Sequence, residues 1–510
     1  MKKISLFFII FLLASSAAAY DEKQREIEKA LFVTAGAEDR VLKIGLVDCI
    51  AYALKNNSEI KVERISPQLK KDDVKIAYGT FEPSFTTELT LADNTEVASS
   101  RLQGAGKYNT QDINLNAGIS GKLVTGTEYS LDFLNQKYKS DSTYQIYNPY
   151  YTAEPKITIT QPLFKGAGVL VNKADILIAR NNEMQSEESF KDTAISTISK
   201  VKNTYYKYVF FVEAYAIEEL ALERIMKLLE INKARYAKGL ASSVDILETE
   251  AEVAQKQKII LTAESEMKKA EDELKLVTNL VDDPEVWNAR IELIDKPQFV
   301  IVDANLVKSV GLAFDNRPDY KSAKIDLENR DIKIKAAKNA LLPTFDLNGS
   351  LGLNGLGADY GKALQKVSPD YPDWSVGVKF SVPWGEADRA KYNQRQLEKL
   401  QTLIAFKRLE QNIIFDVRDR VREVNIQARQ VEVSKLYQDK EGENFRAQKE
   451  RYAEGQVSTH DMLDYQDKLS RAQLSYLKAL VEYNVALISL DKSEGLTLVK
   501  NDVKLSLASD

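Results

Sequence analysis

Residues 235–258 read RYAKGLASSVDILETEAEVAQKQK, and residues 451–474 read RYAEGQVSTHDMLDYQDKLSRAQL. Eight of the 24 aligned positions are identical: Arg, Tyr, Ala, Gly, Ser, Asp, Leu and Gln. In each copy a glycine follows one helical pattern, and Ser-x-x-Asp opens the next. Glycine after a helix and serine before one are the usual stop and start signals. Both segments therefore predict a tight turn between two helices.

The duplication extends over most of the chain. AYGTFEPSF at 77–85 corresponds to AKNALLPTF at 337–345, and Gln161-Pro162-Leu163-Phe164 corresponds to Val382-Pro383-Trp384. These matches fall at corresponding places in the two halves. We therefore predict a first repeat at 20–282, an inter-repeat linker or equatorial segment at 283–304, a second repeat at 305–498 and a C-terminal tail at 499–510.

The first 19 residues have the composition of a secretory signal peptide. Lys2 and Lys3 precede an apolar core at 4–13, and the segment ends in Ala17-Ala18-Ala19. The core is shorter than the ~20 residues of a membrane-spanning helix, so we expect cleavage after Ala19; an uncleaved anchor is the alternative. Cys49 is the only cysteine, so an internal disulfide cannot form.

Segments of alternating polarity occur in each half. Period-two alternation predicts strands with one apolar and one polar face. The predicted strand regions are about 84–161 in the first half and about 344–382 in the second. The apolar sets of these strands begin at Phe85, Ile113, Tyr129, Ile157, Phe345 and Val376.

Helical patterns surround these strands. An amphipathic helix is predicted before them, at about 46–80 and 305–340, ending near Pro83 and Pro343. A long helix is predicted after them, at 172–236 and 387–452, and a returning helix at 244–280 and 460–490. Residues 172–236 contain neither Pro nor Gly, so this helix would be about 100 Å long. Its apolar stripe has near-heptad spacing: Val201, Tyr205, Tyr208, Val212, Tyr215, Leu222, Met226 and Leu229.

Strands with one apolar face form either a soluble sandwich or a membrane barrel. A barrel must close, because unpaired backbone groups in lipid are costly, and single-chain barrels have eight or more strands. This chain offers only four to six strand-like segments, so a barrel would need several copies. The long helices could also bury their apolar faces only against other long helices of the same kind. Both arguments favour an oligomer with a barrel at one end and a helical tube at the other.

From about residue 44 to residue 498, the chain resembles the TolC family of outer-membrane efflux proteins. The resemblance is carried by Asn316-Arg317-Pro318-Asp319-Tyr320, Leu342-Pro343, Gln161-Pro162-Leu163-Phe164 and the two R-Y-A-x-G-x-x-S-x-x-D turns. It implies a homotrimer in which each chain gives four strands to a twelve-stranded outer-membrane β-barrel, continued by a long periplasmic α-helical barrel. The expected fold class is α+β, helix-dominated, with an internal twofold repeat.

The first strand region departs from this pattern. It is about twice as long as the second and holds up to four strand-like segments, where the resemblance implies two. The excess could be an extracellular hairpin rich in tyrosine, with Tyr144, Tyr147, Tyr150 and Tyr151. These tyrosines could form an aromatic belt at the membrane interface or could be ordinary loop residues, and the sequence favours neither.

The Ser-x-x-Asp segments of the two turns allow two interpretations. Ser242 with Asp245, and Ser458 with Asp461, have the spacing of a capping box. An acid there also suits the positive end of a helix, with a contribution of about 0.3–1 kcal/mol. On this interpretation the acids only begin the returning helices.

The resemblance gives the same turns a second role, because in the family they form the periplasmic tip of the tube. Asp461 and Asp464 match two acids that ring the closed aperture. Such a ring favours cations, and we expect mutual repulsion to raise some of the proton affinities. Asp245 and Glu248 repeat the spacing as accessory acids. The arginine that locks the family's closed state has no match just after Gly455.

Partner proteins are also implied by the resemblance. Gly239, Leu240, Gly455 and Gln456 match the positions at which a periplasmic adaptor (membrane fusion) protein docks. A helix turn needs glycine in any case, which is the alternative reading of these positions. The other implied partners are an inner-membrane pump or ABC transporter and the lipid of the outer membrane.

These features predict a passive channel of the outer membrane with its helical barrel in the periplasm. It would be the exit duct of a tripartite efflux or type I secretion system for small molecules or proteins. A secreted coiled-coil envelope scaffold or adaptor protein is the alternative, and it would not need detergent for extraction.

Other classes of function find little support. The chain has one histidine, His460, and one cysteine, so we expect no enzyme, metal site or cofactor. Gly166-x-Gly168 is too short for a phosphate-binding loop and lacks its lysine. The net charge of −5 argues against a nucleic-acid partner.

Overall fold

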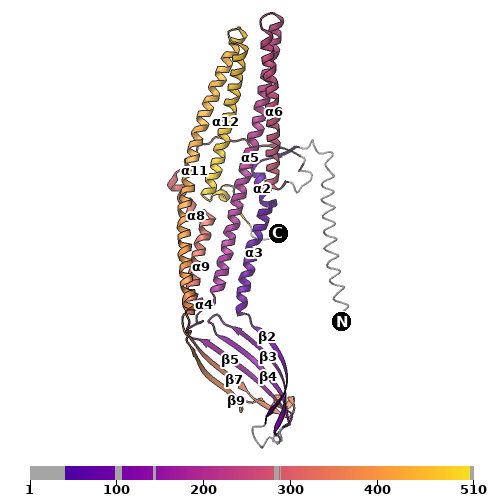
Figure 1. Ribbon diagram of the computed structural model, residues 1–510, viewed down its shortest axis with the longest axis vertical. Helices are drawn as coiled ribbons and strands as arrows, with labels where there is room; N and C mark the ends of the chain where they lie inside the picture. Colours follow the sequence, from indigo (N-terminus) through magenta and orange to yellow (C-terminus); the bar gives the residue numbers. More distant parts are fainter. Residues whose placement is uncertain (1–40, 98–105, 142–144, 281–286, 288, 506–510) are drawn as a thin grey trace, which may run out of the picture. The chain divides into compact units, whose positions relative to one another are not determined.

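The computed structural model describes residues 41–97, 106–141, 145–280, 287 and 289–505 (Figure 1). The predicted signal peptide, 1–19, lies outside these residues. The described residues separate into two compact units, of which the first comprises those within 41–65, 188–320 and 409–505 and the second those within 66–187 and 321–408. Both repeats therefore contribute to both units.

Long helical hairpins form the first unit (Figure 1). One hairpin pairs α5 (Ala174–Ala237) with α6 (Ser243–Thr278), and the other pairs α11 (Ala387–Ala453) with α12 (Thr459–Ser493). α5 and α11 begin in the second unit. The shorter helices are α2 (Leu46–Asn56), α8 (Leu306–Asn316) and α13 (Thr497–Lys500), which crosses the boundary predicted at 498. In the described part of the chain, every helix is too short or too polar to cross a membrane.

Each repeat supplies one equivalent hydrophobic core in this unit. The first core joins α2, α5 and α6 to a parallel strand pair, β1 (Val41–Ile44) and β6 (Arg290–Leu293), and the second joins α8, α11 and α12. Buried tyrosines tie the predicted linker, 283–304, to both cores. The hydroxyl of Tyr208 donates to Ile291 O at 2.8 Å, and that of Tyr483 donates to Val300 O at 2.6 Å. A buried hydroxyl needs such a partner, so these tyrosines fix the path of the linker.

The amphipathic helix predicted before each strand region is two helices, so this prediction is wrong in both repeats. Asn57 separates α2 from α3 (Ser58–Tyr78), and Arg317 separates α8 from α9 (Pro318–Ala340). Both residues are extended, with φ/ψ of −59°/129° and −63°/124°. Pro318 disfavours a helical conformation at Arg317. The Asn57 side chain instead accepts a hydrogen bond from Glu59 N at 2.9 Å, beginning α3.

The apolar stripe predicted on the first long helix is correct only in its first part. Val201, Tyr205 and Tyr208 are buried, but Met226 is 51% exposed, and Ile225 and Leu228 are buried instead. α5 packs against α2 and α6 around the tyrosines, and against α11 and α12 nearer its end. The buried side of the helix therefore changes, as expected where a straight helix drifts away from a strict heptad.

The second unit contains an antiparallel sheet of order β2-β3-β4-β5-β7-β9 (Figure 1). Its strands are β2 (Ser84–Val97), β3 (Lys107–Lys122), β4 (Glu128–Ser140), β5 (Tyr150–Pro162), β7 (Thr344–Leu353) and β9 (Pro372–Ser381). A short strand, β8 (Gly355–Gly357), pairs with β5 and precedes α10 (Tyr360–Gln365). The first repeat thus gives four long strands and the second gives two. The sheet therefore has two long strands more than the four per chain implied by the family resemblance.

The excess in the first strand region is therefore not a loop. Tyr150 and Tyr151 lie in β5, and the ring of Tyr150 stacks on Tyr138 of β4 with centroids 4.9 Å apart. Tyr147 lies just before β5, and Tyr144 is outside the described residues.

The second unit also holds the ends of the helices that join the sheet. η1 (Gly79–Phe81) follows α3, and α4 (Val169–Asn172) precedes α5. Asn181 of α5 donates to Asn329 of α9 in a buried side-chain hydrogen bond of 2.8 Å. The four strand ends that join helices lie at one end of the sheet, which we call its base (Figure 1).

Replacing Val209 with proline should destabilise the protein severely. Val209 is buried in the first core, and proline would remove a helix hydrogen bond and clash with the preceding turn, at a cost of about 3 kcal/mol or more. Thermal unfolding followed by circular dichroism should show a much lower midpoint than for Val209→Ala, which shortens the side chain but keeps the helix. Equal midpoints for the two variants would contradict a continuous α5.

Candidate functional site: the paired helical turns

The two hairpins of the first unit end in the same turn. Gly239 and Gly455 have φ of +71° and +81°, a conformation that side chains with a β-carbon rarely adopt. In the first turn Leu240 N donates to Arg235 O at 2.8 Å, and in the second Gln456 N donates to Arg451 O at 2.9 Å. These bonds satisfy carbonyl groups at the helix ends, as in a Schellman motif. Both glycines are therefore required by the turn.

A capping box follows the first turn, and a serine cap follows the second. Ser242 Oγ accepts from Asp245 N at 3.2 Å, and Asp245 Oδ2 accepts from Ser242 N at 2.8 Å. In the second turn Ser458 Oγ accepts from Asp461 N at 3.1 Å and donates to Asp461 Oδ2 at 2.6 Å. The geometry at Asp245 and Asp461 therefore fits the capping interpretation.

These contacts also favour the ionised form of the two carboxyl groups. The backbone amide and hydroxyl of Ser242 hold the pKa of Asp245 below its ordinary value. The hydroxyl of Ser458 does the same for the pKa of Asp461. Within one chain the shift at Asp461 is thus opposite to the one expected from repulsion between acids.

The other two predicted acids have positively charged or titratable partners. Asp464 forms an ion pair of 2.7 Å with Lys468, one turn further along α12. Glu248 of α6 lies 2.6 Å from His460 Nδ1 of α12, so it links the two hairpins rather than standing apart as an accessory acid. The hydrogen bond and charge of Glu248, with the charges of Asp461 and Asp464, raise the pKa of His460 above its ordinary value.

A buried polar network behind the turns was missed by the sequence reading. Arg235 donates to Tyr452 O at 3.1 Å, and its guanidinium lies 4.9 Å from the Tyr452 ring. The Tyr452 hydroxyl bonds Asn232, and it lies 3.1 Å from the hydroxyl of Thr459. Asn232 in turn donates to Thr249 of α6 at 2.9 Å. The network therefore ties both hairpins together at their tips.

A sequence signal for this network existed, because Arg-Tyr opens both copies of the repeated turn. Only the arginine of the first copy and the tyrosine of the second meet within the chain. Their counterparts Tyr236 and Arg451 are exposed.

Further from the tips, a buried lysine joins the two hairpins. Lys256 of α6 has a side chain only 4% exposed and lies 3.3 Å from Glu218 of α5 and 3.5 Å from Asp467 of α12. Arg224 of α5 also donates to Ser470 of α12 at 3.1 Å. Such contacts favour one alignment of the hairpins, because a buried charge that loses its partner is strongly destabilising.

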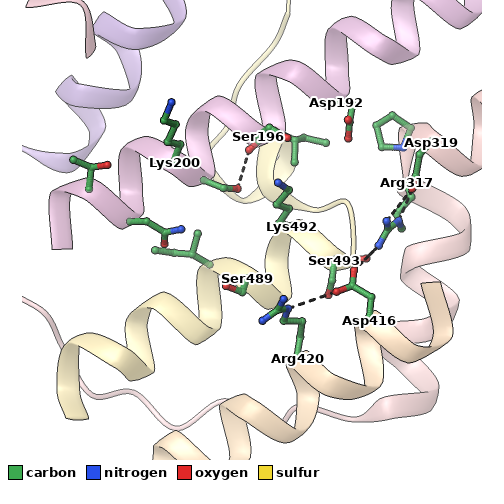
Figure 2. Close-up of a pocket in the computed structure, with 16 residues that line it drawn as sticks. Asp192, Ser196, Lys200, Arg317, Asp319, Asp416, Arg420, Ser489, Lys492 and Ser493 are labelled. Carbon is green, nitrogen blue, oxygen red and sulfur yellow. Dashed lines mark hydrogen bonds and ion pairs between the residues drawn. The ribbon is translucent and has the colours of Figure 1, made fainter. Parts of the chain in front are cut away.

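A second polar site surrounds the Asn-Arg-Pro-Asp-Tyr motif, in a cavity of about 630 Å³ between α5, α11 and α12 (Figure 2). Arg317 forms ion pairs of 2.8 Å with Asp319 and 2.9 Å with Asp416. It also donates to Ser493 O at 3.4 Å. Burial and the nearby charge of Asp319 raise the pKa of Asp192 across the cavity. Arg317 thus joins α9, α11 and the end of α12.

The described residues contain no cluster of three or more His, Cys, Asp or Glu side chains suited to a metal ion. The chemistry of the turns and of the Arg317 cavity is that of ion pairs, helix caps and hydrogen bonds.

The sequence model of the outer membrane efflux protein family matches residues 49–280 and 310–496. The chain belongs to the outer membrane efflux protein family. The two matched stretches correspond to the two structural repeats, and the gap between them contains the linker held by Tyr208 and Tyr483.

Curated relatives of this outer membrane efflux protein are distant. The toxin and drug export protein A of Aggregatibacter actinomycetemcomitans is 25% identical over 305 residues, or 58% of this chain and 63% of that protein. Nodulation protein T of Rhizobium leguminosarum bv. trifolii is 24% identical over 321 residues, or 60% of this chain and 65% of that protein. The match thus spans a little under two thirds of each relative.

The fold of the outer membrane efflux protein is shared with solved channels. The Campylobacter jejuni CmeC outer membrane channel superposes with a TM-score of 0.62 at 16% identity. The superposition covers 89% of this chain and 86% of that one.

Replacing Glu248 with glutamine should lower the pKa of His460 toward its ordinary value. A raised pKa means that the contact between α6 and α12 is strongest below this pKa and weakens as the pH rises through it. The chain has one histidine, so NMR titration of histidine-labelled, tag-free protein gives one signal. Glu250→Gln on the same helix is the control, because Glu250 pairs with Lys233. An unchanged pKa in Glu248→Gln would disprove the contact.

Proposed function

We propose that this protein is a passive exit duct of the outer membrane, in which three copies close one β-barrel and continue into a periplasmic helical barrel. The exposed apolar face of the sheet carries this proposal. Across all six long strands, pairing places Phe85, Ile119, Leu131, Ile157, Leu351 and Trp374 in one row. Their side chains are 38–70% exposed. A soluble protein rarely exposes a contiguous apolar surface of this kind.

The opposite face of the sheet suits the lumen of a channel. It is polar, and Lys156 forms ion pairs there with Glu154 at 3.2 Å and Asp373 at 3.3 Å. Glycine at 118 and 352 leaves room for neighbouring acids, since an added β-carbon would lie 2.3 Å from Asp132 Oδ1 or 2.6 Å from Glu154 Oε1. Apolar side chains outward and polar side chains inward are typical of outer-membrane barrels.

Several copies are needed because the sheet does not close on itself. Its edges are β2 and β9, and every residue of β9 and all but one of β2 are exposed. Unpaired strand edges do not occur in the hydrocarbon region of a membrane. Edge pairing between copies satisfies this requirement, and family membership supports the number three.

The paired turns would form the gate at the periplasmic end. Asp461 and Asp464 of three chains would ring the aperture, with Lys468 reducing the charge near Asp464. Asp245 and Glu248 would support the ring from α6. The exposed turn residues Gly239, Leu240, Gly455 and Gln456 would receive the adaptor protein, which connects the duct to an inner-membrane pump or ABC transporter. The duct itself would perform no catalysis, and energy would come from these partners.

The cargo we propose is small molecules or proteins. The relative named as a toxin and drug export protein supports this choice. In a duct the cargo passes through the lumen, so the selectivity of the system would lie in the pump and the adaptor.

The protein should require detergent for extraction from membranes and should have the mass of a trimer in that detergent. The exposed apolar sheet face and the open edges are the reasons. Native mass spectrometry or light scattering with detergent correction gives the mass. A stable monomer in detergent would contradict the shared barrel, and release by a salt wash would favour the envelope scaffold.

Replacing both Asp461 and Asp464 with asparagine should weaken cation selectivity and block by multivalent cations severalfold in planar bilayers. The fold should persist, because asparagine also serves at helix starts. Asp461→Asn changes both cap and ring, whereas Asp464→Asn changes mainly the ring. Lys468→Gln is the matched control and should strengthen cation selectivity, because it removes the charge that compensates Asp464. Unchanged selectivity in the double variant would place the aperture elsewhere.

A further inference from the structure

We infer that the additional β2–β3 hairpin is part of the membrane wall, so that each chain gives six strands and three copies close an eighteen-stranded barrel. This inference rests on the proposed function, since it concerns the width of the same duct. The occupant of the free β2 edge is then β9 of a second copy, and the apolar face of the hairpin contacts lipid.

The hairpin is continuous with the rest of the sheet. β2 pairs with β3 over the full length of β2, from Ser84 to Val97, and β3 pairs with β4 from Thr110 to Lys122. The row that starts at Phe85 and Ile119 continues without a break to Leu351 and Trp374 in the second repeat. A separate extracellular hairpin would not share one apolar face with the strands of the barrel.

The apolar band of the hairpin also lies at the same level as that of the other strands. Levels are counted in residues from the base end of each strand. Leu89 lies five residues from Ser84 and Val376 five from Ser381, while Leu115 lies seven from Lys122 and Leu351 seven from Thr344. All four side chains are at least half exposed.

Above this band the hairpin becomes polar on the same face. Gln111 of β3 donates to Asp93 of β2 at 3.0 Å. In the hairpin the apolar set spans seven residues of each strand, from Phe85 to Leu91 and from Ile113 to Ile119, or roughly 23 Å along the strand at about 3.3 Å per residue. At a strand tilt of about 40° its height is about 18 Å, compared with the ~25 Å apolar band of outer-membrane barrels.

The stagger of the sheet corresponds to a strand tilt found in closed barrels. Phe85 lies one residue past the start of β2, whereas Trp374, in the same row, lies seven residues before the end of β9. Six residues of stagger are about 20 Å, across five strand spacings of about 4.8 Å, or about 24 Å. The ratio gives a strand tilt of about 40°, within the range of about 35–45° found in barrels.

The consequence is a wider exit than the family resemblance implies. Barrel diameter grows roughly linearly with strand number, so eighteen strands give a diameter about 1.5 times that of twelve. Barrels of about 16–18 strands leave an open aqueous channel. The narrowest point of the duct would then lie at the turns and not in the membrane.

Lipid quenching of single-cysteine variants tests this inference on the full-length protein. Leu89→Cys and Leu115→Cys probe the hairpin, and the matched controls are Val376→Cys and Leu351→Cys, at the same two levels in the second repeat. Thr90→Cys and Ser375→Cys report the polar face. Cys49 is fully buried, and burial raises its pKa to about 12, so it should not react with the label. Each protein is labelled with bimane and placed in vesicles with brominated acyl chains.

The expected result is equal quenching at Leu89, Leu115, Leu351 and Val376 and little at Thr90 and Ser375. Quenching at Leu351 and Val376 but not at Leu89 and Leu115 would overturn the inference while leaving a membrane barrel in place. Quenching at none of the four would instead remove the proposed function, and the inference with it. A variant that does not reach the trimer is replaced by cysteine at Leu91 or Val378, which lie on the same apolar face.

Discussion

Backbone hydrogen bonding at the two edges of the sheet is the constraint on which the rest of this structure depends. A sheet of six twisted strands leaves β2 and β9 open, and a single chain cannot join them. In lipid, an open edge is too costly to persist. On the proposed function, self-association follows from the strand number, and the apolar face explains why it would occur in a membrane. The exposed edges β2 and β9 would then be interfaces between copies.

The two repeats share several local features. Each repeat breaks its first helix at one extended residue, Asn57 or Arg317, and ends its long helix at a glycine with positive φ. Each also anchors the linker through a buried tyrosine hydroxyl. The repeats differ in strand number, where the first has one more hairpin than the second. A hairpin can be added to an antiparallel sheet without changing the direction of the chain, because it returns to the end from which it started.

Polar contacts accompany an apolar cluster where the hairpins meet near their tips. Arg235, Asn232, Tyr452, Thr249 and Thr459 form a buried network there, and Lys256 lies between Glu218 and Asp467 further along the helices. Polar partners specify one alignment of the helices, because a buried polar or charged group that loses its partner is destabilising. On the proposed function, such contacts would hold the gate closed in a defined position.

Sequence alone determined the repeat, the long helices, the turns with their caps, and strands with one apolar face, because each depends on residues close in the chain. Tertiary structure decided which strands pair, and it placed all four long strands of the first repeat in one sheet with the two of the second. It also decided that Arg235 meets Tyr452, that Glu248 meets His460, and that Met226 is exposed while Ile225 is buried. These contacts join residues up to 217 positions apart or depend on which helix packs where. Local periodicity carries no information on such choices, because the same pattern fits several partners.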